Sequence, residues 1–128
     1  MNAARRVHAL RINSLAKLYS GISLTTVDRL IEMFNAGVVP AIPELGTVGA
    51  SGDLAPLAHL ALGLIGEGEL WDPKTQTFNS ALEVLKNHNL KVAELNAKDG
   101  LGLINGTAFI TGVGSLALEA AINIIKSV

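Results

Sequence analysis

Apolar residues recur at helical spacing along most of this chain, and this periodicity limits the possible fold more than any other feature. It predicts helices over 3–17, 23–37, 53–66, a short stretch opened by Ser80, and 108–126. One short strand is expected around Leu70 and Trp71. Side chains expected to cap the helices are Ser23 or Thr25, Asp53, Ser80 and Thr107. The sequence therefore predicts a mainly α fold.

The first predicted helix is amphipathic. Val7 and Leu10 belong to its apolar stripe, and the basic side chains are expected elsewhere on the helix surface. These basic residues are Arg6, Arg11 and Lys17.

The composition indicates that other protein covers part of this chain. Charged residues make up 16% of the sequence and hydrophobic residues 49%, whereas about 25% of a typical soluble domain is charged. The formal net charge of −1 argues against a nucleic-acid-binding protein. The sequence contains no cysteine, which excludes disulfides and thiolate metal sites and agrees with a cytoplasmic location.

The segment 107–125 is long enough to cross a bilayer, but it contains Glu119 and Asn123. Because these polar groups are costly in lipid, we expect a buried core helix instead. Its last full turn is still apolar and lacks a clear cap, which predicts that the chain is a fragment of a longer protein.

Residues 38–53 have neither helical nor strand periodicity. Pro40, Pro43, Gly46 and Gly49 interrupt this segment, which predicts a shaped loop that ends at the start of the third helix. By contrast, residues 69–98 are more polar, and we expect them to form a surface excursion.

Common patterns of catalytic and metal sites do not fit. His8, His59 and His88 are too far apart for a metal pair on one helix face, so each is expected at the surface or the core edge. The glycine-rich run 46–52 lacks the lysine of a phosphate-binding loop. Asp53 also stands where a serine-hydrolase elbow needs its second glycine.

The triplet Ala50-Ser51-Gly52 permits a different use of the serine. In a tight turn, the Gly52 amide nitrogen can attack the Ala50 carbonyl carbon, because glycine has no side chain that blocks the approach. Loss of two waters, one from ring closure and one from the Ser51 side chain, leaves an imidazolone with an exocyclic methylene. This electrophile differs from ordinary side chains, which act as nucleophiles, acids or bases.

The triplet alone is weak support, since it occurs by chance in about one chain in twenty-five of this length. Its surroundings carry the interpretation. Glycines and prolines precede it, Asp53 follows it, and the positive end of a helix would favour negative charge on the electrophile.

Three blocks resemble the signature of the aromatic amino acid ammonia-lyases, a family that includes histidine and phenylalanine ammonia-lyases. The main block is GTVGASGDLAPLAHLALG at 46–63. The others are RINSL at 11–15 with YSG at 19–21, and GLGLINGT at 100–107. They follow the family order over nearly the whole chain.

This resemblance implies a helical bundle enzyme, several times longer than this chain and assembled as a homotetramer. Residues 1–128 would be its electrophile-bearing core segment, in which 38–53 is the cofactor-forming loop. The cofactor would be methylidene-imidazolone, formed autocatalytically from Ala50, Ser51 and Gly52, with no metal or nucleotide. The chain alone is then expected to be inactive.

The resemblance also assigns roles to single residues. Asn105 would hydrogen-bond near the electrophile and stabilise negative charge, Leu54 and Leu101 would line the substrate pocket, and Asp53 would anchor the turn. Without the resemblance, Asn105 is a good turn residue, the two leucines are core residues and Asp53 is a helix cap. Tyr19 is expected to serve packing.

Within the family, His59 and residues 66–71 resemble histidine ammonia-lyases, which implies L-histidine as substrate and trans-urocanate as product. Three positions depart from the family pattern. Leu18 stands in place of the usual glycine, Gly102 in place of alanine, and Ala108 where histidine ammonia-lyases generally have glutamine. A phenylalanine or tyrosine ammonia-lyase or an aminomutase is the alternative within the family. A helical assembly module that never cyclises is the alternative of another class.

Overall fold

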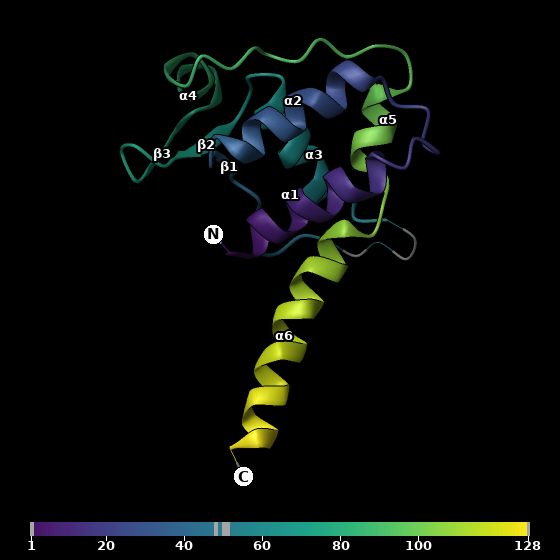
Figure 1. Cartoon of the computed structure of the whole chain (residues 1–128), viewed down its shortest axis with the longest axis vertical. Coiled ribbons are helices and arrows are strands. Elements are labelled where there is room, and N and C mark those ends of the chain that lie inside the picture. Colours follow the sequence, from purple (N-terminus) through teal and green to yellow (C-terminus); the bar gives the residue numbers. More distant parts are fainter. Residues whose placement is uncertain (1, 48, 50–51, 128) are drawn as a thin grey trace.

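The computed structural model describes residues 2–47, 49 and 52–127, and this part of the chain is mainly helical, as predicted (Figure 1). Its helices are α1 (Asn2–Leu15), α2 (Leu24–Asn35), α3 (Leu54–Leu64), α4 (Ala81–Asn87), α5 (Asp99–Ile104) and α6 (Ala108–Lys126). Its strands are β1 (Val39–Pro40), β2 (Glu69–Asp72) and β3 (Thr77–Ser80).

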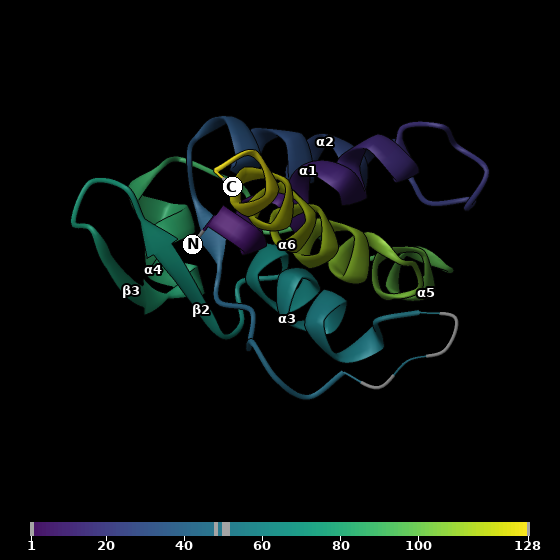
Figure 2. The ribbon, with the colours of Figure 1, turned by 90° about the horizontal axis from the view of Figure 1, so that it is seen from below.

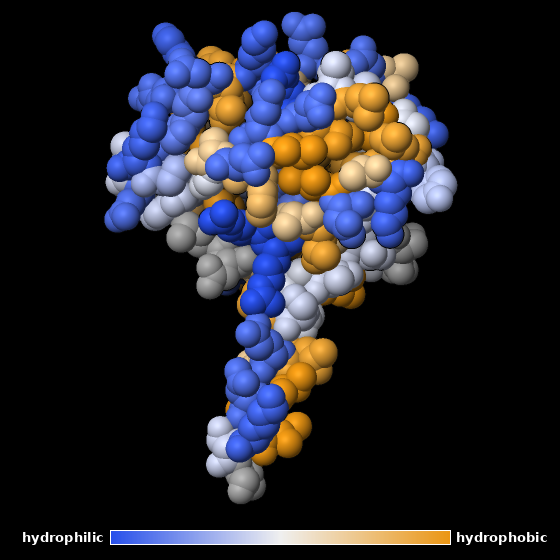
Figure 3. All heavy atoms as spheres, in the orientation of Figure 1, coloured by the Kyte–Doolittle hydropathy of each residue, from blue (hydrophilic) through white to orange (hydrophobic). Residues whose placement is uncertain are grey.

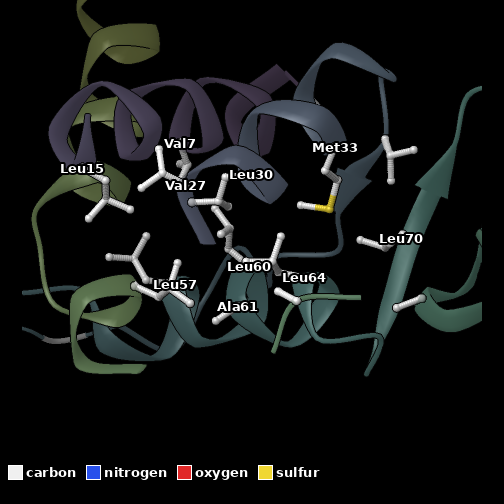
Figure 4. Packing of buried hydrophobic residues seen from close by; sticks show 14 of the residues in the cluster. Val7, Leu15, Val27, Leu30, Met33, Leu57, Leu60, Ala61, Leu64 and Leu70 are labelled. Atoms are coloured by element: carbon white, nitrogen blue, oxygen red, sulfur yellow. The ribbon is translucent and has the colours of Figure 1, made fainter. Parts of the chain in front are cut away.

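The hydrophobic core lies where α1, α2 and α3 meet (Figure 4). Val7, Leu30, Leu57 and Leu60 are fully buried there. These residues lie on the apolar stripes of the three helices, so burial of one face of each helix brings the helices together. The core therefore follows directly from the periodicity of the sequence.

Beside this core, the three strands form an antiparallel sheet in the order β1-β2-β3. Val39 lies opposite Trp71, and Trp71 lies opposite Phe78. The predicted strand at Leu70 and Trp71 is the central strand β2. The edge strands β1 and β3 were not predicted, because β1 has only two residues and β3 has no buried residue to mark an alternation.

Residues 69–98 are less superficial than the sequence indicated. Leu70, Ala81, Val84 and Leu85 all belong to the main core cluster. The expectation of a surface excursion is therefore wrong for these side chains. Their neighbours in the sequence are polar, which hides the buried positions of such a short sheet and helix.

The helix starts were predicted better than the caps. Ser23 caps α2, since its hydroxyl oxygen accepts the Thr26 N–H at 3.4 Å. Ser80 and Thr107 stand at the N-cap positions of α4 and α6, but neither side chain makes a capping hydrogen bond. Sequence spacing thus located the boundaries without fixing the side-chain partners.

Helix α6 begins beside α1 and α3 and then projects away from the rest of the chain (Figures 1 and 2). Its predicted bounds are correct, but only Ala108, Phe109 and Gly112 are buried. The expectation of a core helix is therefore wrong within this chain. Figure 3 shows hydrophobic residues along one side of the projecting part and hydrophilic residues along the other.

The base of α6 is fixed to α1 by close packing and by charge. A Cβ on Gly112 would lie 3.0 Å from Val7 Cγ2, so a small residue is needed at this crossing. Further along, Arg6 forms an ion pair with Glu119 at 2.8 Å. The stretch Asp99–Lys126 is long and apolar enough to span a membrane by those two measures alone, but it includes this ion pair and the break between α5 and α6.

Candidate active site

The candidate site is the junction between the end of the loop 38–53 and the turn that separates α5 from α6. Ala50 and Ser51, two of the three residues predicted to form the electrophile, lie outside the described residues. Gly49 and Gly52 flank them. A Cβ on Gly49 would overlap the Gly52 carbonyl oxygen, so these two glycines lie close together.

Asn105 lies directly against Gly52. A Cβ built on Gly52 would lie 2.7 Å from Asn105 Oδ1, which is closer than any real side chain tolerates. Any side chain at position 52 would therefore displace the Asn105 amide. The structure brings together two predicted site residues that are distant in the sequence.

Asp53 connects this loop to the start of α6. The side chain is buried, and its carboxylate accepts the Thr47 hydroxyl at 3.1 Å and the Ile110 N–H at 2.9 Å. The Asp53 backbone N–H also donates to the Gly106 carbonyl oxygen at 3.0 Å. Asp53 thus holds the chain on either side of the turn.

The same contacts correct the predicted role of Asp53 as a helix cap. Asp53 stands at the N-cap position of α3, but its side chain makes no capping hydrogen bond to that helix. Its carboxylate is turned to the first turn of α6 instead. The first N–H groups of α3 therefore receive no side-chain acceptor from Asp53, and the positive end of this helix lies two residues after Gly52.

Arg11 is the main residue at this junction that the sequence analysis misplaced. It was expected on the surface, but only 4% of it is exposed. Its Nη2 donates to the Gly102 carbonyl oxygen and to the Asn105 carbonyl oxygen, the latter at 2.8 Å. A Cβ on Gly106 would overlap Arg11 Nη1. The guanidinium therefore occupies the space that glycine leaves open in the turn.

A sequence signal for the burial of Arg11 existed. Val7, Arg11 and Leu15 are four residues apart, which places them on one face of α1, and both neighbours are buried. A basic residue is usually exposed, so residue type predicts the surface for Arg11 whereas its position between two apolar residues predicts burial. The carbonyl partners of Arg11 are too distant in the sequence for spacing to reveal them.

Asp99 fixes the other end of α5. Its buried carboxylate accepts the Ser23 N–H at 2.7 Å, the Thr26 hydroxyl at 2.9 Å and the Asn96 N–H at 2.8 Å. Burial raises the pKa of Asp99, but these hydrogen bonds outweigh it and bring the pKa to about 2. The start of α5, the helix that leads to Asn105, is thereby attached to the start of α2.

The remaining predicted residues differ in how far they are exposed in this chain. Leu54 on α3 and Leu101 on α5 are about half exposed, so neither is a core leucine here, and their role in a substrate pocket stays a prediction. Tyr19 is 93% exposed in this chain, and its packing role stays a prediction for the complete protein. His59 is exposed as expected, whereas His8 is fully buried and was misplaced at the core edge.

Comparisons with known proteins agree with this organisation. The sequence model of a family described as aromatic amino acid lyase matches residues 1–128. The chain is 60% identical over 117 residues to histidine ammonia-lyase of Homo sapiens, covering 91% of this chain and 18% of that protein.

Solved structures give the same result. Histidine ammonia-lyase from Trypanosoma cruzi matches with a TM-score of 0.88 and 49% identity, covering 95% of this chain and 23% of that one. Tyrosine aminomutase from Streptomyces globisporus matches with a TM-score of 0.82 and 42% identity, covering 94% and 22%. The chain thus spans about a fifth of the length of these relatives.

Proposed function

The chain belongs to the aromatic amino acid lyase family, and we propose that it is the electrophile-bearing segment of a histidine ammonia-lyase. The complete enzyme would convert L-histidine to trans-urocanate and ammonia. The observation that carries the chemical part of this proposal is the placement of Asn105 against Gly52, just before α3. Because the chain covers only 18% of its human relative, the activity is assigned to the complete enzyme.

The described residues fit a methylidene-imidazolone formed from Ala50, Ser51 and Gly52. Ring closure needs a glycine as the third residue and a backbone that doubles back on itself. A Cβ on Gly52 would displace Asn105 Oδ1, and Gly49 lies close to the Gly52 carbonyl oxygen. Once formed, this group would supply an electrophile for the amino acid substrate, which protein side chains do not provide.

The surrounding residues would support this group electrostatically and by position. Oδ1 is the Asn105 atom nearest to the Cβ position of Gly52, and a half-turn of the amide group would bring its two N–H donors to the same place, where they would stabilise negative charge. The positive end of α3 would act in the same direction. Asp53 would hold the loop in place, because its carboxylate accepts the Ile110 N–H and its backbone N–H donates to the Gly106 carbonyl oxygen.

The substrate assignment rests on similarity. Of the relatives named above, the two histidine ammonia-lyases are 60% and 49% identical to this chain and the aminomutase 42%. Leu54 and Leu101 offer half-exposed apolar side chains on α3 and α5, and we assign them to the substrate pocket. Ala108, which departs from the usual glutamine, is buried at the start of α6.

We also propose that the complete enzyme is a cytoplasmic homo-oligomer, a tetramer by family resemblance. The apolar side of the projecting α6 supports association, since Leu118, Ile122 and Ile125 are exposed in the single chain. Size-exclusion chromatography with light scattering tests the oligomeric state, and cell fractionation tests the location.

Two measurements on the complete enzyme test the proposed reaction. A deficit of two waters in the peptide that contains Ser51 is expected from mass spectrometry, together with urocanate formation from L-histidine, followed by ultraviolet absorbance. Ser51→Ala should remove both. Normal turnover in Ser51→Ala would overturn the proposal.

The same experiments separate the alternatives. Full mass at Ser51 and no turnover would favour an assembly module without catalysis. A two-water deficit with a β-amino acid as product would indicate an aminomutase, the second candidate that the 42% identity to tyrosine aminomutase favours.

A further inference from the structure

We propose that Arg11 is a positioning residue for this reaction, because it holds Asn105 against Gly52 by binding the backbone that carries Asn105. The inference rests on the proposed function and adds a residue from α1 to the site. Arg11 itself is not assigned contact with the substrate or the electrophile.

The contacts of Arg11 enclose the turn after α5. Nη2 donates to the carbonyl oxygens of Gly102 and Asn105, and Nη1 lies where a side chain on Gly106 would be. The guanidinium therefore fixes the backbone before, at and after the residue whose side chain faces Gly52. Movement of Arg11 would move Asn105 directly.

Asp53 holds this turn from the other side. Its backbone N–H binds the Gly106 carbonyl oxygen, and its carboxylate binds the Ile110 N–H at the start of α6. The turn that carries Asn105 is thus held on one side by Arg11 of α1 and on the other by Asp53, just before α3. Because Arg11 and Asp53 both bind this turn, the position of the Asn105 amide relative to Gly52 is set by residues on rigid elements.

The charge of Arg11 argues against a role in packing alone. Among the described residues, the ion pairs join Arg6 to Glu119, Arg29 to Glu32 and His88 to Asp72, so no acidic partner compensates Arg11. Its Nε is also buried without a hydrogen-bond partner, and burial lowers the pKa of Arg11. Burying an unpaired cation is costly, whereas an apolar side chain would fill the same space without that cost.

A guanidinium has the geometry that this position needs. It is planar and presents several N–H donors in a fixed fork, whereas a lysine ammonium is a single point charge on a flexible stem. One group can therefore bind two carbonyl oxygens and still pack flat against Gly106. We expect lysine at position 11 to retain the charge but lose part of the positioning.

The test compares variants of the complete enzyme. Arg11→Met removes the donors and keeps an unbranched side chain, and Arg29→Met is the matched control, because Arg29 lies on α2 and forms an ion pair with Glu32 on the same helix. The constant kcat is expressed per subunit that carries the two-water deficit at Ser51. Arg11→Met is expected to lower kcat roughly tenfold to hundredfold, as misplacement by about 1 Å does elsewhere, with little change in KM. Arg29→Met should leave kcat unchanged.

A double-mutant cycle with Asn105→Ala separates positioning from general stability. If Arg11 acts through Asn105, Arg11→Met should lower kcat by less than about twofold in the Asn105→Ala background. Hydrogen exchange gives a readout independent of turnover: the peptide 102–110 should exchange faster in Arg11→Met than in Arg29→Met. If Arg11→Met does not assemble, the cycle is measured with Arg11→Lys, for which an intermediate loss of kcat is expected.

Unchanged kcat and unchanged exchange in Arg11→Met would overturn the inference, and so would equal losses of kcat in both backgrounds. In each case the wild-type enzyme would still show the two-water deficit and urocanate formation, so the proposed function would stand. A wild-type enzyme with full mass at Ser51 and no turnover would instead overturn the proposed function and this inference together.

Discussion

Asp53 donates its backbone N–H to the Gly106 carbonyl oxygen at 3.0 Å, and this hydrogen bond joins the start of α3 to the turn before α6. The carboxylate of the same residue binds the Ile110 N–H at 2.9 Å. One buried residue therefore connects the loop predicted to form the electrophile with the segment that carries Asn105. Its substitution tests whether the junction depends on the carboxylate.

We predict that Asp53→Asn destabilises the protein by about 1–3 kcal/mol, the usual cost of leaving a buried donor unsatisfied. An amide offers one oxygen acceptor where the carboxylate offers two, so either Thr47 or Ile110 loses its partner. Urea denaturation of wild type and variant measures the change. Asp28→Asn, at an exposed position on α2, is the control, and an equal loss in both variants would contradict the prediction.

Gly106, in the turn between α5 and α6, lies where a larger residue would not fit. Gly106→Ala is expected to destabilise the protein by about 1–3 kcal/mol, the cost of overpacking a filled site, because the new Cβ would overlap Arg11 Nη1. Gly114→Ala on α6 is the matched control, since no atom lies within 4 Å of its Cβ position. That control should gain up to about 1 kcal/mol from helix propensity. Thermal denaturation of both variants measures the difference, and a stabilised Gly106→Ala would show that Arg11 moves away freely.

Asp53 and Gly106 show which features of the structure can be predicted from the sequence alone and which cannot. Helical periodicity predicted the main elements because most of their stability comes from burying one face. The family blocks indicated Gly52, Asp53 and Asn105 as site residues. Their mutual contacts join parts of the chain that are far apart, and no local pattern encodes which carbonyl or amide a buried polar group will bind.

Charged residues were the least predictable part of the site. Arg11 was placed on the surface by its type, and Asp53 was assigned to the nearest helix end by its position. In the structure, both side chains bind backbone groups of the segment 102–110. Propensity describes what a residue prefers on average, whereas here the tertiary partners decide its hydrogen bonds.

Leu18 shows that a departure from the family pattern can have a conformational cost. It has a φ of 62°, in the left-handed region that glycine adopts without strain, and the family resemblance implies glycine at this position. Leu18→Gly is therefore expected to stabilise the protein by about 0.5–1 kcal/mol, since relief of strain exceeds the entropy cost of glycine. Chemical denaturation measures this gain. Leu95→Gly, also at an exposed loop position but without a positive φ, should lose stability, and a loss in Leu18→Gly would refute the strain argument.

His8 predicts how stability depends on pH. It is fully buried, its ring is edge-on to Phe34, and its Nε2–H donates to the Leu30 carbonyl oxygen at 3.0 Å. Burial lowers the pKa of His8 from 6.5 to about 4, the hydrogen bond to Leu30 opposes this change, and the nearby Arg5 adds to it. His8 is therefore neutral in the folded protein at a pH where the unfolded chain binds a proton.

Because the pKa is lower in the folded state, the stability due to His8 is fully present above pH 6.5 and is lost as the pH falls toward 4. At about 1.4 kcal/mol for each pH unit between the two pKa values, the complete loss would be at most about 3.5 kcal/mol. We expect His8→Gln, which does not titrate, to show a flatter dependence of unfolding free energy on pH over this range, although it is less stable at pH 7. His59→Gln changes an exposed histidine and should keep the wild-type slope. Urea denaturation at half-unit pH steps would contradict the argument if wild type and His8→Gln had the same slope, because the proton taken up on unfolding would then bind elsewhere.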